Sequence, residues 1–303
     1  MSVENPQRRR VLGVAAVAAL PLRAGSADAV VTRAIPRSGE RVPVVGMGTW
    51  LTFDIGRSAF DLTRRRQVLQ AFYAGGGRVI DSSPMYGRAE AVMGELLPQL
   101  ADTRQTFSAT KVWTTGRDAG ARQMRDSLRL WGLTRFDLMQ IHNMVDWEVH
   151  LATLKEWKAQ GLIRYIGITT SHGRRHEALE AAMRREEFDF IQVTYSLADR
   201  SVERRLLPLA AERGVAVIAN RPFDGGALVD QLVGFRLPAW AARIGCESWA
   251  QVSLKWIVSH PAITCAIPAT TNPDHARENI GALRGPLPDA DLRRTIADHV
   301  ARL

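Results

Sequence analysis

The 303-residue sequence has few cysteines, few lysines and no apolar run of membrane-spanning length. Its two cysteines, Cys246 and Cys265, lack the spacing of a metal-binding pair and leave open one disulfide or two buried thiols. His172 and His176 stand four residues apart without a third ligand, so no metal site is predicted. The apolar run at 11–22 is too short to span a hydrocarbon core of about 30 Å. These shortages argue against a metalloprotein and against stable membrane insertion.

Lysine is much rarer than arginine in this sequence. It occurs only at positions 111, 155, 158 and 255, although Lys and Arg together number 40. Arginine keeps its charge under nearly all conditions, whereas the pKa of a lysine shifts readily when the side chain is buried. Because Lys111 interrupts an otherwise apolar segment, this lysine is a candidate functional residue.

The net charge of +9 and the sequence pI of about 10.3 raise the question of nucleic-acid binding. The basic residues are mixed with acidic ones along helix-like segments, as in the Arg-Arg-Glu-Glu sequence at 184–187. No basic stripe interleaved with aromatic residues is present, and no nucleic-acid-binding motif. The sequence therefore predicts a solvated basic surface and no nucleic-acid partner.

Residues 1–29 have the three parts of an export signal. Three arginines at 8–10 precede the apolar run at 11–22, and Ala-Asp-Ala at 27–29 provides a cleavage pattern. Paired arginines before a weakly hydrophobic core resemble a twin-arginine signal, although Gln7 and Val11 depart from that pattern. We predict a signal peptide at 1–29, contact with the export machinery and a periplasmic or exported enzyme. The alternative is a cytoplasmic protein with a basic tail.

The rest of the chain alternates short apolar runs with amphipathic segments of helix length. The eight runs span residues 44–48, 78–81, 106–111, 136–142, 163–169, 188–195, 215–220 and 263–268. Val- and Ile-rich strands separated by helices indicate a parallel sheet that is covered on its outside.

Eight such units over about 240 residues predict an α/β fold, the (β/α)8 TIM barrel, as a single domain at 31–303. The segment 31–44 is predicted to form an N-terminal β-hairpin cap. No G-x-G-x-x-G sequence lies between a strand and a helix, which removes the usual support for a doubly wound sheet. The long insertion 224–249 is predicted to be a loop plus one extra helix.

Three consecutive predicted strands end in residues that can carry chemistry. The second strand ends at Asp81 with Tyr86 shortly after it, the third ends at Lys111, and the fourth ends at His142. Active sites of such barrels lie at the C-terminal ends of the strands. We therefore expect these four side chains, called here the rim residues, to meet on one face of the barrel.

The rim residues form a chemically consistent set. A phenol with a pKa near 10 can protonate a developing alkoxide, and a nearby ammonium favours the phenolate and lowers that pKa. Asp81 can hold the ammonium of Lys111 charged and in place, while His142 can hydrogen-bond a substrate carbonyl. No side chain donates a hydride, so the hydride must come from a cofactor.

The sequence Asp-Ser-Ser-Pro-Met-Tyr-Gly at 81–87 resembles the Asp-x-x-x-x-Tyr-Gly signature of aldo-keto reductases. Lys111 and His142 match the remaining catalytic residues of that family in order and approximate spacing. The resemblance implies NAD(P)H-dependent reduction of an aldehyde or ketone to an alcohol, with NADP or NAD as cofactor, a small-molecule carbonyl as substrate and Tyr86 as the acid.

The resemblance also implies binding residues. For the nicotinamide half of the cofactor these are Gly48, Thr49, Trp50, Thr169, Thr170, Gln192, Asn220, Pro222 and Phe223. For the adenosine-phosphate half they are Thr270, His275, Glu278 and Asn279. The substrate pocket is expected to include Trp50, Trp113 and His142, with Trp240 of the long insertion as a further wall.

Several positions depart from the family pattern. Thr170 stands where an Asn is common, which predicts weaker binding of the carboxamide. Asn220 stands where an aromatic residue often covers the nicotinamide, so Phe223 is expected to take that part. Ala269 and His275 replace the Lys and Arg that commonly grip the 2′-phosphate. We therefore predict a weaker preference for NADPH over NADH than is usual in the family.

Two other functions remain open from the sequence. A barrel aldolase would use Lys111 to form a Schiff base with its substrate. A nucleotide-binding sensor or subunit would hold the cofactor with little turnover.

Overall fold

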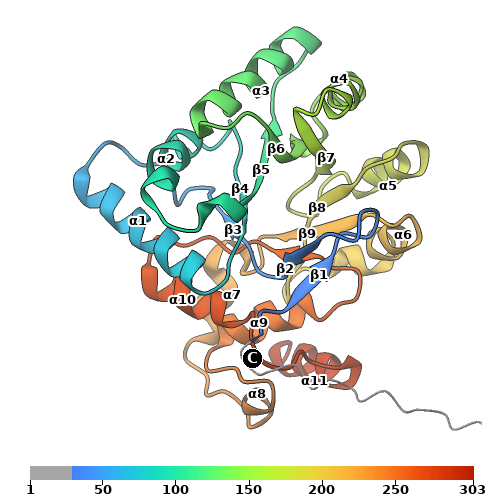
Figure 1. Cartoon of the computed structure of the whole chain (residues 1–303). Helices are drawn as coiled ribbons and strands as arrows, with labels where there is room; N and C mark the ends of the chain where they lie inside the picture. Colours follow the sequence, from blue (N-terminus) through green and yellow to red (C-terminus); the bar gives the residue numbers. More distant parts are fainter. Residues whose placement is uncertain (1–28) are drawn as a thin grey trace, which may run out of the picture.

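The computed structural model describes residues 29–303. Apart from Ala29, the predicted export signal lies outside the described residues. Within them, ten strands and the helices around them build a parallel barrel with an antiparallel hairpin beside it (Figure 1).

Eight parallel strands form the centre of the molecule. They are β3 (Met47–Gly48), β4 (Val79–Asp81), β5 (Phe107–Val112), β6 (Phe136–Ile141), β7 (Ile163–Thr169), β8 (Phe190–Thr194), β9 (Ala216–Asn220) and β10 (Cys265–Ala266). Each strand pairs with the next one in the chain. A parallel bridge between Val45 and Ala266 joins the first strand to the last, with Gly46 N–H donating to the Ala266 carbonyl at 2.8 Å. The predicted α/β barrel is confirmed.

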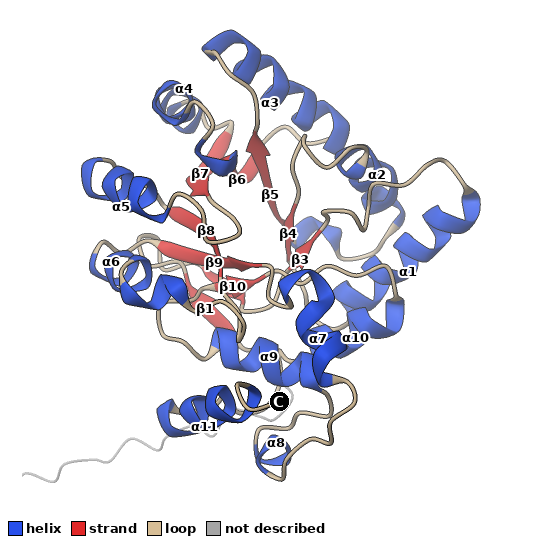
Figure 2. Cartoon of the chain, turned by 180° about the vertical axis from the view of Figure 1, so that it is seen from behind, coloured by secondary structure: helices blue, strands red, loops and turns tan. Residues whose placement is uncertain are grey.

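Helices surround the strands on the outside, as the view from behind shows (Figure 2). They are α1 (Ala59–Ala74), α2 (Ala89–Leu96), α3 (Arg117–Trp131), α4 (Trp147–Ala159), α5 (His176–Arg185), α6 (Leu206–Glu212), α9 (Trp249–Val258), α10 (Pro273–Gly281) and α11 (Ala290–Val300).

The sequence of α3 illustrates why these segments become helices of this length. Its buried residues Gly120, Met124, Ser127 and Trp131 recur every three or four positions and so share one face. The helix ends at Gly132, which adopts the left-handed conformation with φ of 67° that glycine tolerates best.

The predicted hairpin cap is also confirmed. Strands β1 (Thr32–Ala34) and β2 (Arg41–Pro43) pair antiparallel, with Thr32 opposite Pro43. Ile35 and Val42 join a buried cluster with the strand residues Phe107, Leu138 and Phe190. Burying an aliphatic side chain of this size contributes about 1.5–3 kcal/mol, so the hairpin is held on the barrel largely by apolar contact.

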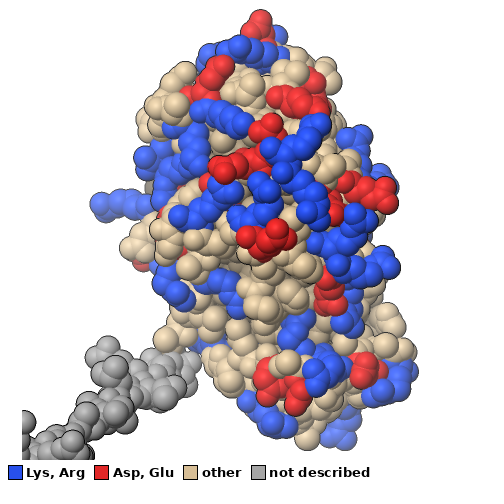
Figure 3. All heavy atoms as spheres, turned by 90° about the vertical axis from the view of Figure 1, so that its right-hand side faces the viewer, with Lys and Arg blue, Asp and Glu red and all other residues tan. Residues whose placement is uncertain are grey.

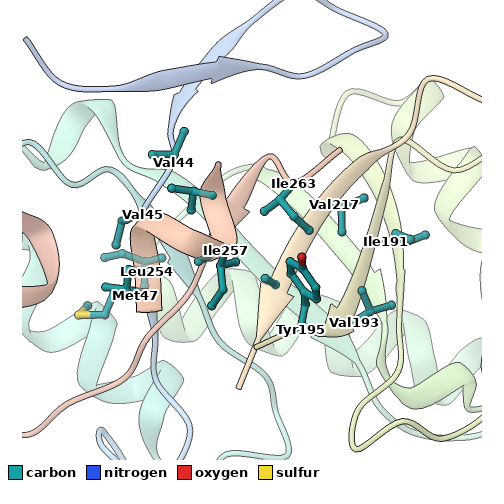
Figure 4. Packing of buried hydrophobic residues seen from close by; sticks show 14 of the residues in the cluster. Val44, Val45, Met47, Ile191, Val193, Tyr195, Val217, Leu254, Ile257 and Ile263 are labelled. Atoms are coloured by element: carbon teal, nitrogen blue, oxygen red, sulfur yellow. The ribbon is translucent and has the colours of Figure 1, made fainter. Parts of the chain in front are cut away.

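A larger apolar core lies between the strands and the helices. In the part drawn in Figure 4, Leu254 of α9 lies beside Val45 and Met47, and Val217 of β9 lies near Ile263. Both cysteines are buried and unpaired, Cys246 beside α9 and Cys265 within β10. The structure thus has two buried thiols in place of the possible disulfide.

The long insertion differs from the prediction. It holds two short helices, α7 (Ala227–Leu232) and α8 (Trp240–Arg243), where the sequence had predicted one. Gly234 and Pro238 lie between them, and both residue types disfavour a continuous helix.

Basic and acidic side chains are mixed on the surface. On the face drawn in Figure 3, Lys and Arg side chains are interspersed with Asp and Glu. None of the helices within residues 29–303 combines the length and the hydrophobicity needed to cross a bilayer.

Candidate active site

The structure brings the four rim residues together at the C-terminal ends of β4, β5 and β6. The Lys111 ammonium donates to Asp81 Oδ2 at 2.5 Å and to the Ser82 carbonyl at 2.7 Å. Its Nζ lies 5.0 Å from the centroid of the Tyr86 ring. The His142 ring stands edge-on to Tyr86, with 5.7 Å between the ring centroids. These contacts arise because in-register parallel strands bring their C-terminal ends to the same edge.

Two glutamines hold Asp81 from the side opposite Lys111. Gln140 Nε2 donates to Asp81 Oδ1 at 2.8 Å, and Gln192 Nε2 donates to the same oxygen at 3.0 Å. Both oxygens of this buried carboxylate are therefore hydrogen-bonded, as a buried charge requires. Gln140 was not among the predicted site residues. It immediately precedes Ile141 and His142, so its position at a strand end was the available signal.

The buried ion pair determines the charge of Lys111. Burial by itself lowers the pKa of the ammonium, but the charges of Asp81 and Tyr86 outweigh burial and raise that pKa above its ordinary value. Lys111 therefore stays charged through the neutral range, with its Nζ close to the phenol ring.

Tyr86 differs in one respect from the sequence-based expectation. Lys111 lowers the pKa of the phenol as expected, but burial raises the pKa by more and Asp81 adds to the rise. In the protein without cofactor, the phenol is therefore protonated through the neutral range and above it. The sequence could not show that burial would outweigh the charge of Lys111.

His142 is held beside the phenol as a neutral imidazole. Burial, and then the charge of Lys111, lower the pKa of this histidine to about 3. Its Nδ1 lies 2.9 Å from Ser83 Oγ, and the Trp113 ring centroid lies 6.4 Å from that of His142.

A cleft of about 330 Å³ opens over the rim residues. Its walls include many predicted residues: Gly48, Thr49, Trp50, Asp81, Tyr86, His142, Thr169, Thr170, Gln192, Asn220, Pro222 and Phe223. They also include residues that were not predicted to belong to the site: Leu51, Thr52, Met85, Asn143, Ser171, His172, Arg221, Gly225, Gly226, Ile267 and Ala269. Leu51, Asn143, Ser171 and Arg221 directly follow a predicted position in a strand-end loop, which was the signal that could have found them.

The model of the Aldo/keto reductase family matches residues 44–297. The chain belongs to this family. The match includes all eight barrel strands and all four rim residues and ends within α11 (Ala290–Val300).

Two methylglyoxal reductases align with this chain over most of their own length. A methylglyoxal reductase of Escherichia coli K12, YeaE, is 29% identical over 83% of this chain and 89% of its own length. The NADH-specific methylglyoxal reductase of the same organism is 26% identical over 85% of this chain and 95% of its own. Among solved structures, a Klebsiella pneumoniae aldo/keto reductase in complex with NADP and acetate is 26% identical. It superposes with a TM-score of 0.73 over 86% of this chain and 92% of the other.

The side of the cleft that is predicted to hold the nicotinamide contains a network of amides and hydroxyls. Asn220 Nδ2 donates to the Thr170 carbonyl at 3.0 Å, and Asn220 Oδ1 accepts from Thr194 Oγ1 at 2.8 Å. Both ends of the Asn220 amide are thus held by the protein. Gln192 Nε2 donates to Asp81 and to Gln140 Oε1, and Gln192 Oε1 accepts a long hydrogen bond from Asn220 Nδ2 at 3.5 Å.

Thr170 provides the test of whether these residues fit a carboxamide. Its hydroxyl is buried and has no hydrogen-bond partner among the described residues, although Thr170 lines the cleft. A buried hydroxyl without a partner costs free energy unless a ligand satisfies it. Together with the second lone pair of Gln192 Oε1, this hydroxyl suits an amide that both donates and accepts, as the nicotinamide carboxamide does.

The residues predicted to bind the adenosine-phosphate half of the cofactor are not among the lining residues of the main cleft. Thr270 and Asn279 line a small separate cavity together with Gly46 and Met47. His275 and Glu278 are on α10, whose N-terminus is capped by the Asn272 side chain.

Of the three tryptophans predicted for the substrate pocket, Trp50 lines the cleft, whereas Trp113 and Trp240 are not among its lining residues. Trp113 is 43% exposed and lies outside the cleft, with its ring centroid 6.4 Å from that of His142. Trp240 packs instead against Trp249 and His299, with ring centroids 6.1 and 6.0 Å away. The structure thus places Trp240 in an aromatic cluster with α9 and α11, because α8 folds onto those helices and not over the cleft.

Proposed function

We propose that this protein reduces an aldehyde or ketone to the alcohol with NADPH or NADH, with Tyr86 as the general acid. The observation that carries the proposal is the buried Lys111–Asp81 ion pair beneath a protonated phenol, beside a neutral imidazole, on the floor of one cleft. When bound, the cofactor supplies the hydride that forms the new C–H bond.

The protein side chains orient the substrate, supply the proton and stabilise the phenolate that remains. The substrate oxygen lies between Tyr86 and His142, where the imidazole orients it by a hydrogen bond. As negative charge develops on that oxygen, the Tyr86 hydroxyl transfers its proton and completes the alcohol. The Lys111 charge stabilises the resulting phenolate, and Asp81 keeps that charge in position. Thr170, Gln192 and Phe223 would hold the nicotinamide against the substrate.

Short dicarbonyl compounds are the first substrates to test. Two relatives are named as methylglyoxal reductases, and the cleft has the volume of a small-molecule site. Oxidation of NADPH and of NADH should be followed by absorbance with methylglyoxal and a panel of aldehydes and ketones.

Substitution of Tyr86 by Phe tests the assignment of the acid. It should lower kcat by about 10²–10⁴-fold, the usual contribution of a positioned proton donor, while cofactor binding measured by fluorescence quenching is unchanged. Tyr195→Phe is the matched control, since Tyr195 is also buried but donates to Glu203 away from the cleft. A Tyr86→Phe enzyme with wild-type kcat would remove Tyr86 from the mechanism.

The Schiff-base alternative loses support from the geometry. An amine that attacks a carbonyl must be neutral, whereas Lys111 is paired with Asp81 and its pKa is raised. Borohydride treatment in the presence of substrate should leave Lys111 unlabelled.

We further propose that the enzyme is exported and loses residues 1–29. The arginines at 8–10, the short apolar run and the Ala-Asp-Ala sequence support this. Proteins that use the twin-arginine route cross folded, so the cofactor would be loaded beforehand. Cell fractionation with N-terminal sequencing is the test, and an intact N-terminus on a wholly cytosolic enzyme contradicts it.

A further inference from the structure

Ser83 is buried between the end of β4 and Tyr86, and its hydroxyl has two polar neighbours among the described residues. The Met85 backbone N–H donates to Ser83 Oγ at 3.2 Å. The same oxygen lies 2.9 Å from Nδ1 of His142. Ser83 itself is fully buried, so no bulk water competes for the hydroxyl.

The donors and acceptors in this group can be counted. A serine hydroxyl has one hydrogen, and a buried hydrogen of this kind is nearly always donated to an acceptor. The Met85 N–H is itself a donor and cannot accept that hydrogen. His142 Nδ1 is the remaining neighbour, so the hydroxyl donates to it and Nδ1 must carry a lone pair.

The other ring nitrogen then carries the proton. The pKa of His142 is lowered to about 3 by burial and by Lys111, so the ring is neutral and holds one proton at neutral pH. With Nδ1 unprotonated, that proton is on Nε2. Because His142 lines the cleft and Nδ1 faces Ser83, Nε2 is the nitrogen left to meet a ligand.

We propose that Ser83 is a positioning residue that fixes His142 as the Nε2–H tautomer, so that the imidazole presents a hydrogen-bond donor to the substrate oxygen. The opposite tautomer would direct a nitrogen lone pair at that oxygen and repel it. Ser83 does not touch the substrate, and its effect passes entirely through His142. The inference rests on the proposed carbonyl reduction.

The tautomer can be measured without any change of activity. Two-bond ¹H–¹⁵N correlation spectra of the histidine-labelled wild-type protein at neutral pH distinguish the two tautomers for each of its seven histidines. His142→Gln identifies the His142 signals by their loss. We expect protonated Nε2 and unprotonated Nδ1, and the reverse pattern would overturn the proposal.

Substitutions then test whether the hydrogen bond matters for turnover. Ser83→Ala should give a mixture of tautomers and lower kcat/KM by about tenfold, the effect of losing one buried hydrogen bond, without changing cofactor affinity. Ser83→Thr keeps a hydroxyl and should restore the Nε2–H tautomer and most of the activity. Ser127→Ala is the matched control, because it removes another buried serine hydroxyl, which donates to Glu90 at 3.0 Å. It should affect stability but neither the tautomer nor kcat/KM.

The outcomes separate this inference from the proposed function. A wild-type enzyme that reduces no carbonyl defeats the proposed function, whatever the tautomer proves to be. An active wild type whose Ser83→Ala variant keeps a pure Nε2–H signal and full kcat/KM defeats only the role of Ser83. Because the wild-type spectrum needs no substitution, the proposal stays testable if Ser83→Ala fails to fold.

Discussion

Two of the four lysines are completely buried, and their surroundings are opposites. Lys111, at the C-terminal end of β5, is paired with the Asp81 carboxylate. Lys255, on α9, donates only to backbone carbonyls, those of Ile244, Arg284 and Pro286. Burial lowers the pKa of both, but only Lys111 has neighbouring negative charge that reverses the effect and raises its pKa.

This difference shows that burial alone does not make a lysine functional. Lys255 connects the segment before α9 to the loop after α10 by satisfying carbonyls that would otherwise lack donors. Lys111 holds a charge beneath a phenol in a cleft, where that charge can stabilise a reacting group. The predictions below test this division, in order of decreasing effect.

Replacing Lys111 by Met should have the largest effect. It leaves Asp81 as a buried unpaired charge, which destabilises by about 3–5 kcal/mol, and it should lower kcat/KM by about 10³-fold or more. Urea denaturation and steady-state kinetics measure the two effects. Adding Asp81→Asn should restore part of the stability but none of the activity, and recovery of activity would contradict the assigned role of the ion pair.

Replacing Lys255 by Met should affect stability alone. The carbonyls lose a shared donor in a buried place, at a cost of about 1–3 kcal/mol, while kcat/KM stays within about twofold of wild type. The same urea titration measures the loss. A folded Lys255→Met enzyme with tenfold lower kcat/KM would show that the two lysines are less distinct than their contacts indicate.

The two lysines should also respond to alkaline pH with opposite signs. The pKa of Lys111 is raised on folding, so its stabilising contribution is complete below the unfolded value near 10.5 and is lost as pH rises through the folded value. The pKa of Lys255 is lowered, so the unfolded chain binds the extra proton just below 10.5 and stability increases with pH there. The urea midpoints of the wild type and of both Met variants should be measured between pH 8 and 11. If the midpoints of all three proteins change with pH in parallel, the opposite signs predicted for the two lysines are wrong.

A lysine introduced at an exposed position should have the smallest effect. Ala269 is exposed at the edge of the cleft, where the family often has a lysine for the 2′-phosphate. Ala269→Lys should raise the kcat/KM ratio of NADPH to NADH by about three- to tenfold, since solvent weakens an exposed charge pair. The wild-type ratio should lie below about 1000-fold, or about 4 kcal/mol. A larger wild-type ratio would mean that another residue binds the phosphate.

Most of the barrel could be predicted because its signals are local. Each of the eight apolar runs overlaps one observed strand, and the rim residues converge because parallel strands place their C-terminal ends on one face. Contacts between segments that are distant in the sequence were harder to predict. Gln140 and Gln192 both reach Asp81, and Ser83 reaches His142, but no spacing in the chain indicates which side-chain atoms will meet.

The amino-acid sequence by itself determined the barrel, its hairpin cap and the set of reactive groups at the rim, because hydrophobic periodicity and strand order operate along the chain. Only the tertiary structure decided that Tyr86 holds its proton, that His142 is neutral and that Trp240 packs on α9 and α11. Burial and electrostatic interaction depend on how segments far apart in the chain exclude water from one another, and that is settled only when they pack.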